Sequence, residues 1–424
     1  MNRSDLVACL ERRMPEALDF LRRLVETNSY TGNRDGVNRV GAITVEMFAP
    51  LGFEAERVAS TNPLWGDHLI LSRPGGGADA IALVSHLDTV FPPEEEVQNR
   101  FHWQREGNRI YGPGTHDIKG GTVMMWLVLM ALRQLAPDLF ERVSWKLFWN
   151  SSEETLSHDF GVVCLERIKS NTRAALVFEA EGRRERVSRL VVARKGRATW
   201  RLRVSGRGAH AGGGHPHGAN AIVQMAHSIQ RVAALTDYAR HITFNLGCVS
   251  GGGGLNRVPH EAVAEGEFRA FTPEAYAAAK SALMALAGPG AVTSPADGYA
   301  CRVAVEILSE SRPWPRNAAT DGLFSVWQRA ARDLDMELES EERGGLSDGN
   351  LLWHAVPTID GLGPYGQNDH CSERSADGSK VPEFVEADSF VPKAALNVTA
   401  IRLLLDPAPR DVRPDVSSRS LGTS

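Results

Sequence analysis

His86 and Asp88 are the first residues of the chain whose types and spacing suit chemistry. They end the run from Ile81 to Asp88, which starts with four apolar residues. A short apolar run of this kind predicts a buried strand. Because residues i and i+2 of a strand point to the same face, both side chains emerge together at its end. This suits a metal-binding imidazole whose other ring nitrogen is held by a carboxylate; a polar strand end is the alternative.

Asp117 is the second candidate, within the run Thr115-His116-Asp117-Ile118-Lys119-Gly120-Gly121. An apolar stretch over 122–135 follows and predicts a buried helix. The Asp117 carboxylate is therefore expected next to unpaired backbone N–H groups at the positive end of the helix dipole. The alternative interpretation is a glycine-rich turn with an N-capping aspartate.

Two further strand ends carry acidic residues. The strand predicted over 143–149 leads into Glu153 and Glu154, and the strand over 174–178 leads into Glu179. Adjacent buried carboxylates repel each other unless a cation neutralises them or one holds a proton. An exposed loop that begins a helix at about 158 is the alternative for the Glu153–Glu154 pair. Since ligands gather at the carboxyl ends of strands in open α/β sheets, the three strand ends are expected to converge.

The elements that position these residues follow an α/β pattern with a break in the middle. Helical spacing covers 5–26 and 37–51, and short apolar segments cover 53–58, 67–72 and 80–85, with a brief strand at 109–111. From about 190 the order becomes βαββαβ, with strands at 198–204, 241–248 and 262–271 and helices at 219–234 and 273–286. The α/β pattern resumes at about 309, with a helix at 319–335, a strand at 355–359 and a helix at 388–405. This predicts an α/β domain over 1–189 and 309–405, an inserted α+β domain over 190–308 and a disordered tail over 406–424.

Composition limits the classes of function. The chain has 424 residues, 42% of them hydrophobic and 23% charged, as in a globular protein of two or three domains. Its net charge of −5 argues against nucleic-acid partners. Five dispersed cysteines, an N-terminus without a signal-peptide pattern and the lack of a long uncharged stretch predict a cytoplasmic protein with no membrane partner.

The motifs, taken together and in order, resemble those of the M20 metallohydrolases, which include glutamate carboxypeptidases, aminoacylases and desuccinylases. The matching motifs are HLD at 86–88, GPGTHDIKGG at 112–121, SSEE at 151–154, FE at 178–179, GRGAHAG at 206–212 and a late His370. The resemblance covers roughly residues 5–405. It implies a two-domain M20 fold: a mixed-sheet α/β catalytic domain with an inserted α+β lid and dimerisation domain.

The resemblance also implies roles for individual residues. One metal would take His86, Asp117 and Glu179, and a second would take Asp117, Glu154 and His370, with Asp117 as the bridge. Glu153 would be the general base and Asp88 would orient His86. Carboxylate and imidazole ligands suit two divalent ions of zinc, or of manganese or cobalt.

The inserted domain is expected to make the protein a homodimer or a higher homo-oligomer. The resemblance implies that His210 stabilises the oxyanion across the dimer, and that Asn256 and Arg269 bind a substrate carboxylate. The three histidines at 210, 215 and 217 also allow a metal tract. A mobile loop that places a single histidine is favoured, because no carboxylate lies within it.

The chain departs from the family pattern after His370. Glu383-Phe384-Val385 follows only after Cys371–Pro382, which is an apparent insertion next to a candidate metal ligand. Loops on a rigid scaffold commonly carry specificity, so Arg374 is predicted to bind a substrate carboxylate. The alternative is a solvated loop in which Arg374 pairs with Glu373.

The leading functional hypothesis is hydrolysis of a C–N bond in a small carboxylate-bearing substrate, with water attacking an amide. The first alternative is an aminohydrolase that removes ammonia from a carboxylated aromatic amine, such as a nitroanthranilate. A non-catalytic metal-binding module on the same fold is the further alternative. The intact Glu153 disfavours it, because a pure binding module does not need a base.

Overall fold

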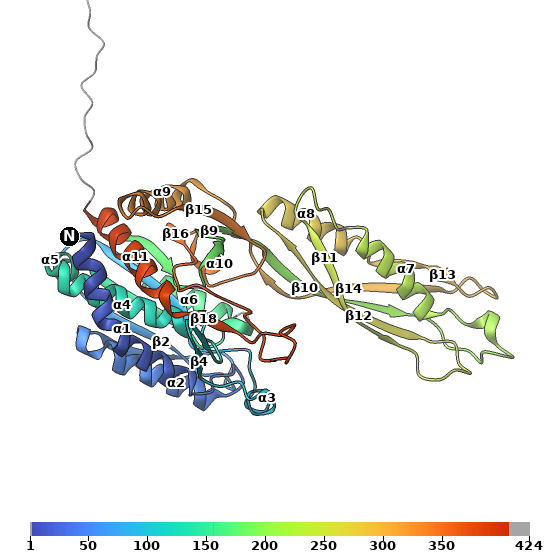
Figure 1. Ribbon diagram of the computed structural model, residues 1–424. Coiled ribbons are helices and arrows are strands. Elements are labelled where there is room, and N and C mark those ends of the chain that lie inside the picture. The colour runs from blue at the N-terminus through green and yellow to red at the C-terminus, as the bar shows by residue number, and fades with distance from the viewer. Residues whose placement is uncertain (1, 156, 407–424) are drawn as a thin grey trace, which may run out of the picture.

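A six-stranded sheet with the order β1-β2-β6-β3-β7-β16 forms the centre of the larger unit in the computed structural model, which describes residues 2–155 and 157–406 (Figure 1). Strands β3, β6, β7 and β16 are parallel, and β1 and β2 are antiparallel to their neighbours. The strands are β1 Glu54–Ala59, β2 Asp67–Arg73, β3 Ala80–His86, β6 Ser144–Asn150, β7 Thr172–Val177 and β16 Thr358–Ile359. The mixed α/β class predicted for this part of the chain is confirmed.

Helices cover both faces of this sheet. Ile81 and Leu83 of β3 pack into the cluster on one face, and the alternating Ala82 and Val84 pack into the cluster on the other. The first face carries α1 Arg3–Val25, α2 Arg34–Phe48, α4 Lys119–Leu135, α9 Ala318–Asp333 and α11 Phe390–Leu405. The second face carries α6 His158–Arg167 and α10 Gly349–Leu352. Burial on both faces explains why β3 reads as a continuous apolar run.

Two small sheets border the strand ends. One has the order β15-β9-β8, from Leu338–Arg343, Val187–Arg194 and Gly182–Arg184. The other has the order β17-β18-β5-β4, from Gly366–Gln367, Phe384–Glu386, Arg109–Tyr111 and Gln104–Glu106. Short helices α3 Pro93–Asn99 and α5 Pro137–Arg142 and the 3₁₀ turns η1 Ala49–Leu51, η2 Glu153–Thr155, η3 His215–His217 and η4 Ala387–Ser389 complete the connections.

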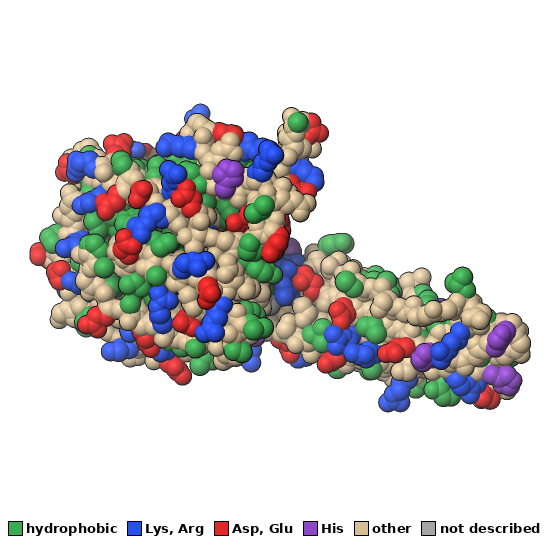
Figure 2. Space-filling model, turned by 90° about the horizontal axis from the view of Figure 1, so that it is seen from below, with side chains coloured by type: hydrophobic (Ala, Val, Ile, Leu, Met, Phe, Trp, Pro, Cys, Tyr) green, Lys and Arg blue, Asp and Glu red, His purple; other side chains and the backbone are tan. Residues whose placement is uncertain are grey.

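The middle of the chain forms a second, elongated unit that extends away from the first (Figures 1 and 2). Its antiparallel sheet has the order β11-β12-β10-β14-β13, and α7 and α8 pack against it. The elements are β10 Gly196–Ser205, α7 Ala221–Ala233, β11 Thr243–Gly251, β12 Glu261–Ala270, α8 Pro273–Met284, β13 Gly288–Thr293 and β14 Ala300–Ser311. The sequence predicted bounds of 190 and 308 for this unit. Its first strand, β10, starts at Gly196, and its last strand, β14, ends at Ser311.

Several elements differ from the sequence prediction. The second unit has an additional strand, β13, whose Gly-Pro-Gly start lacks the alternation that predicts a strand. Only Thr358–Ile359 of the strand expected over 355–359 is extended. The tail expected to be disordered falls, from residue 407 on, outside the described residues. Within the described residues, each helix is too short or too polar to span a membrane.

Candidate metal centre and substrate cavity

The candidate ligands lie where the parallel strands β6, β3 and β7 end side by side. His86 is the last residue of β3, while Glu153 and Glu154 form the turn after β6, and Glu179 follows β7. Neighbouring parallel strands end at the same edge of a sheet, so these side chains converge as the sequence predicts. Gly121 brings the start of α4 against this edge, because a Cβ there would lie 2.0 Å from the Phe178 carbonyl oxygen.

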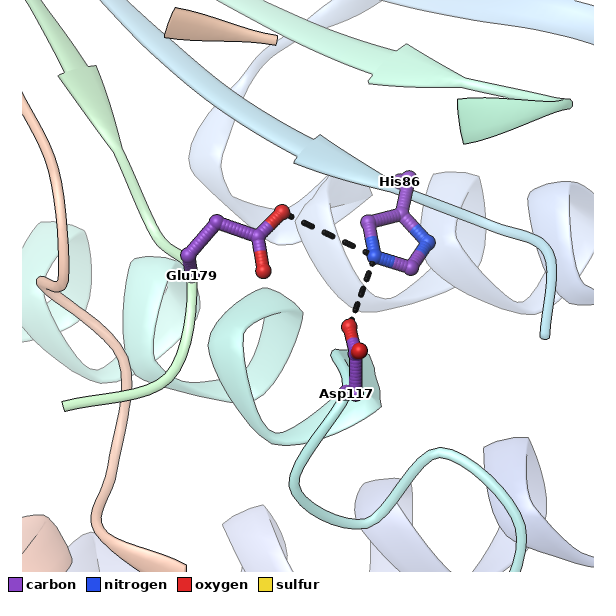
Figure 3. A group of neighbouring side chains, drawn as sticks. All are labelled: His86, Asp117 and Glu179. Atoms are coloured by element: carbon purple, nitrogen blue, oxygen red, sulfur yellow. Dashed lines mark hydrogen bonds and ion pairs between the residues drawn. The ribbon is translucent and has the colours of Figure 1, made fainter. Parts of the chain in front are cut away.

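His86, Asp117 and Glu179 form the first ligand group (Figure 3). His86 Nε2 lies 3.1 Å from Asp117 Oδ1 and 3.7 Å from Glu179 Oε1. One donor atom from each of the three residues lies within 4.8 Å of the others. The His86 side chain is fully buried, and Asp117 and Glu179 are mostly buried. Two carboxylates and an imidazole so placed suit a divalent cation.

Asp117, Glu154 and His370 form the second ligand group. His370 Nε2 lies 3.4 Å from Asp117 Oδ2 and 3.3 Å from Glu154 Oε2. Asp117 therefore directs one oxygen towards each group. The geometry agrees with the bridging role that the resemblance implies for Asp117.

Asp88 connects His86 to the acidic turn. Its side chain lies 3.4 Å from His86 Nδ1, and its backbone carbonyl lies 3.1 Å from the same nitrogen. The backbone N–H groups of Glu153 and Glu154 donate to its two oxygens at 3.1 and 3.3 Å. Thr31 Oγ1 also donates to Asp88 Oδ2, at 2.6 Å. Asp88 thus fixes both the ring and the turn.

The pKa values show that the buried carboxylates compete for protons. Burial, followed by the nearby Asp117, raises the pKa of Glu154 to about 7. Burial raises the pKa of Glu179 to about 8 and that of Glu153 well above its usual range. Burial also acts on Asp117, but hydrogen bonds with His370 and His86 outweigh it and hold that pKa far below its usual range. A bound cation would relieve this repulsion.

One buried carboxylate oxygen gives direct support for a bound cation. Glu154 Oε1 is buried and has no hydrogen-bond partner among residues 2–155 and 157–406. Buried polar atoms normally have a partner, and a carboxylate oxygen is a suitable ligand for divalent metals. The donor set therefore fits the two divalent ions expected from the sequence.

A cavity of about 550 Å³ is lined by residues of both groups and by a set of arginines, called here the cationic wall. The wall consists of Arg194, Arg197, Arg269 and Arg343. Arg194 is neutralised by the buried Asp360, with 2.7 Å between Nε and Oδ2. Arg269 donates to Glu267 at 2.7 Å and to the Gly344 carbonyl at 2.9 Å. The predicted substrate residue Arg269 therefore lies in the cavity.

His210 and Asn256 lie elsewhere in the same chain. The Ala211 N–H donates to the Asn256 carbonyl at 2.9 Å, and His210 pairs with Arg257 in an isolated bridge. Both loops lie beyond the Ser205–Glu261 end of the β10–β12 pair, whereas Arg269 lies near the opposite end. The stretch of β10 from Arg197 to Ser205 spans about 26 Å at about 3.3 Å per residue. Neither residue lines the cavity of its own chain.

Arg374 lies outside the cavity in which its substrate contact was predicted. Its Nη1 donates to both oxygens of Glu106, at 2.9 and 3.2 Å, and its guanidinium lies 4.3 Å from the centre of the Tyr111 ring. It does not line the cavity, so its position gives no support to the predicted substrate contact. The alternative pairing with Glu373 is absent, since Glu373 pairs with Lys380 at 2.7 Å.

Sequence reasoning missed three buried acids near the site. Glu383 accepts hydrogen bonds from the backbone N–H groups of His116 and Asp117, at 2.8 and 3.2 Å. Asp348 accepts one from Asn150 at 2.8 Å, and burial raises its pKa to about 7. Asp360 follows β16 directly, so the rule that found Glu179 also applies to it. Asp348 and Glu383 do not directly follow a strand, and the sequence analysis named Glu383 only as part of the Glu383-Phe384-Val385 motif, without a role at the site.

Several known proteins are similar to this chain in sequence. Residues 192–293 match the M20 peptidase dimerisation domain. Carboxypeptidase G2 from Pseudomonas sp. strain RS-16 is 26% identical over 269 residues, which cover 63% of each chain. The alignment thus spans less than two thirds of that relative. Succinyl-diaminopimelate desuccinylase from Marinobacter nauticus is 24% identical over 387 residues, covering 88% of this chain and 94% of the relative.

The fold is also similar to that of solved M20 structures. A dinuclear metal-binding peptidase of the M20 family from Bacillus subtilis superposes with a TM-score of 0.65 at 13% identity, over 94% of this chain and 99% of the other. The matched domain lies within the unit predicted to be inserted, and the alignment with the desuccinylase, which covers 88% of this chain, extends on both sides of it. In its dimerisation domain, its relatives and its fold, the chain is similar to proteins of the M20 family.

Proposed function

We propose that the protein is a two-metal hydrolase of a C–N bond in a small substrate that carries a carboxylate. The observation that carries the proposal is the pair of ligand groups that share Asp117, with Glu153 beside them and in neither. The named relatives, a carboxypeptidase and a desuccinylase, support the same reaction class.

The five ligands His86, Asp117, Glu154, Glu179 and His370 would hold the two ions. Two divalent ions at such a site polarise the scissile group and make a bound water acidic at neutral pH. Oxygen and imidazole donors favour zinc, manganese or cobalt over a metal that prefers thiolates.

Glu153 is suited to move the proton. It lines the cavity next to the ligands and is partly buried, and burial raises its pKa well above its usual range. A raised pKa makes a carboxylate a stronger proton acceptor. Glu153 would accept the proton of the attacking water and deliver it to the leaving nitrogen.

The cationic wall would bind the substrate carboxylate. Arg197 and Arg269 are direct partners across β10 and β12, and like charges placed opposite each other are destabilising. Arg269 is hydrogen-bonded to Glu267, whereas Arg197 Nε lies 3.7 Å from that carboxylate. Arg197 Nε is also buried without a hydrogen-bond partner in the described part of the chain. A carboxylate would satisfy this nitrogen with a charge-assisted hydrogen bond.

The second unit would complete the site in a homodimer. His210 and Asn256 lie too far from the cavity of their own chain, and the dimerisation-domain match covers both residues. In a dimer, His210 of each chain would reach the cavity of the other and stabilise the developing oxyanion.

The aminohydrolase remains the alternative. Arg374 of the segment 371–382 contacts Glu106 and Tyr111 and does not line the cavity, so this residue gives no support to a distinct pocket for an aromatic amine. The carboxypeptidase and the desuccinylase among the relatives favour the amide.

A substrate screen tests the proposal. Metal-loaded protein is incubated with N-acyl amino acids, dipeptides and aminobenzoates, each beside its carboxamide, which lacks the carboxylate. Amide hydrolysis is expected, with kcat/KM lowered for the carboxamides. Arg197→Ala should lower kcat/KM for the carboxylates about tenfold to a hundredfold and leave the carboxamides unaffected. Ammonia release from an aminobenzoate, with no amide cleaved, would select the alternative; no turnover of any class would contradict the proposal.

A further inference from the structure

His370 is held differently from the other candidate ligands. His86, Glu154 and Glu179 directly end or closely follow strands of the central sheet, whereas His370 lies in the connection between β17 and β18. Its side chain is 54% exposed, and its backbone φ is +64°. Asn368, two residues earlier, has φ +66°. Non-glycine residues keep this left-handed conformation where surrounding contacts hold them.

The contacts that hold this connection come from the segment that follows His370. Ser372 is 3% exposed, and its hydroxyl accepts a hydrogen bond from Asn99 of α3 at 2.7 Å and donates one to Glu95. The neighbouring Cys371 N–H donates to the Asn368 carbonyl at 3.0 Å, and the Cys371 carbonyl accepts from the Glu383 N–H at 2.8 Å. The chain is thus fastened immediately after the histidine.

Arg374 provides a second attachment on a different element. Its guanidinium bonds both oxygens of Glu106 in β4 and stacks on Tyr111 in β5. Two hydrogen bonds and a cation–π contact fix the direction of the segment more firmly than a single ion pair. Ser372 and Arg374 therefore hold the segment against α3 and the β4–β5 hairpin.

We propose that Ser372 and Arg374 are positioning residues that hold His370 at the second metal position. The inference rests on the proposed metal centre. It predicts that the second position depends on this attachment, whereas the first position, built from His86, Asp117 and Glu179, does not. Residues that orient metal ligands commonly change metal affinity tenfold to a hundredfold when they are removed.

The experiment is a zinc titration of metal-free, full-length protein against a competing chelator. Wild type is expected to bind two equivalents with separate dissociation constants. In the double variant Ser372→Ala/Arg374→Ala, the first should stay within about twofold and the second should weaken about tenfold to a hundredfold. Lys380→Ala is the matched control, because its ammonium contacts Glu373 within the same segment; both constants should stay at wild-type values.

Two more variants separate positioning from general loss of structure. The charge exchange Glu106→Arg/Arg374→Glu should recover part of the second affinity lost in Arg374→Glu alone. If the double variant fails to fold, Glu106→Gln removes the charge at an exposed strand and should weaken the second position selectively.

Three results would contradict different parts of this reasoning. An unchanged second constant in the double variant, or equal weakening of both, would overturn the positioning role. A wild type that binds two zinc ions but cleaves no C–N substrate would refute the proposed activity and leave the positioning role standing. A wild type that binds no metal would refute both.

Discussion

The two ligand groups share Asp117 but differ in how the fold supports the rest. The first group relies on His86 at the end of β3 and Glu179 after β7, both in the centre of a sheet buried on two faces. The second relies on Glu154 in a 3₁₀ turn and on the half-exposed His370 in a loop. Close packing gives the first group its order, while hydrogen bonds from sequence-distant residues order the second. Two metal positions that share one carboxylate can therefore differ in rigidity.

The strongest test of the comparison removes the shared residue. Asp117→Ala should abolish tight binding of both ions, because each group then keeps two ligands, and activity should fall to background. Elemental analysis of purified protein measures the metal content. Asp117→Asn keeps the size of the side chain and controls for packing. Full occupancy in the alanine variant would show that the groups are independent.

Glu153 provides the next test, because it belongs to neither group. Glu153→Gln should keep two ions and lower kcat by about a hundredfold to ten-thousandfold, the range for loss of a general base. Metal analysis and steady-state kinetics on the same preparation separate the two effects. Loss of an ion would instead make Glu153 a ligand.

A variant of His210 tests whether one chain of a dimer completes the site of the other. His210→Ala should lower kcat by about a hundredfold to a thousandfold, as for loss of an oxyanion donor. Dimers of one Glu153→Gln chain and one His210→Ala chain contain a single intact site, so activity should partly return after co-refolding. Heterodimers that form but stay inactive would contradict a shared site.

The smallest effect concerns stability without metal. His86→Ala leaves the buried Asp88 without an imidazole partner and Asp117 with that of His370 alone, and it should lower the free energy of unfolding by about 1–3 kcal/mol. His370→Ala should cost less, because His370 is half-exposed and solvent screens its ion pairs with Asp117 and Glu154. Urea unfolding of both metal-free variants measures the difference. Equal losses would remove the distinction between the two groups.

Sequence reasoning located the first group well for a physical reason. An apolar run that ends in a charged residue marks both a buried strand and its exit, so His86 and Glu179 could be predicted from local pattern. Asp117 and Glu154 followed from a glycine-rich turn and an acid pair. His370 lies in no such pattern, and its prediction came from the resemblance to M20 proteins.

The cationic wall and the role of Arg374 could not be predicted in this way. β15 reads Leu-Glu-Ser-Glu-Glu-Arg, which shows no buried face, so Arg343 has no marked strand end. Arg197 gains its significance from lying opposite Arg269, and strand register is a tertiary property. Arg374 was assigned by its closeness in sequence to His370, but its bond to Glu106 depends on how the segment folds back.

The separate hydrophobic clusters of the two units have a consequence for unfolding. Trp200, Phe268 and Leu283 belong to a cluster of the second unit alone, and the chain crosses between the units near residues 195 and 312. Calorimetry is therefore expected to show two transitions rather than one cooperative transition. Because a ligand stabilises the structure that binds it, zinc should raise the melting temperature of the larger unit and leave the other transition in place. Heating could thus melt the second unit while the metal centre stays folded.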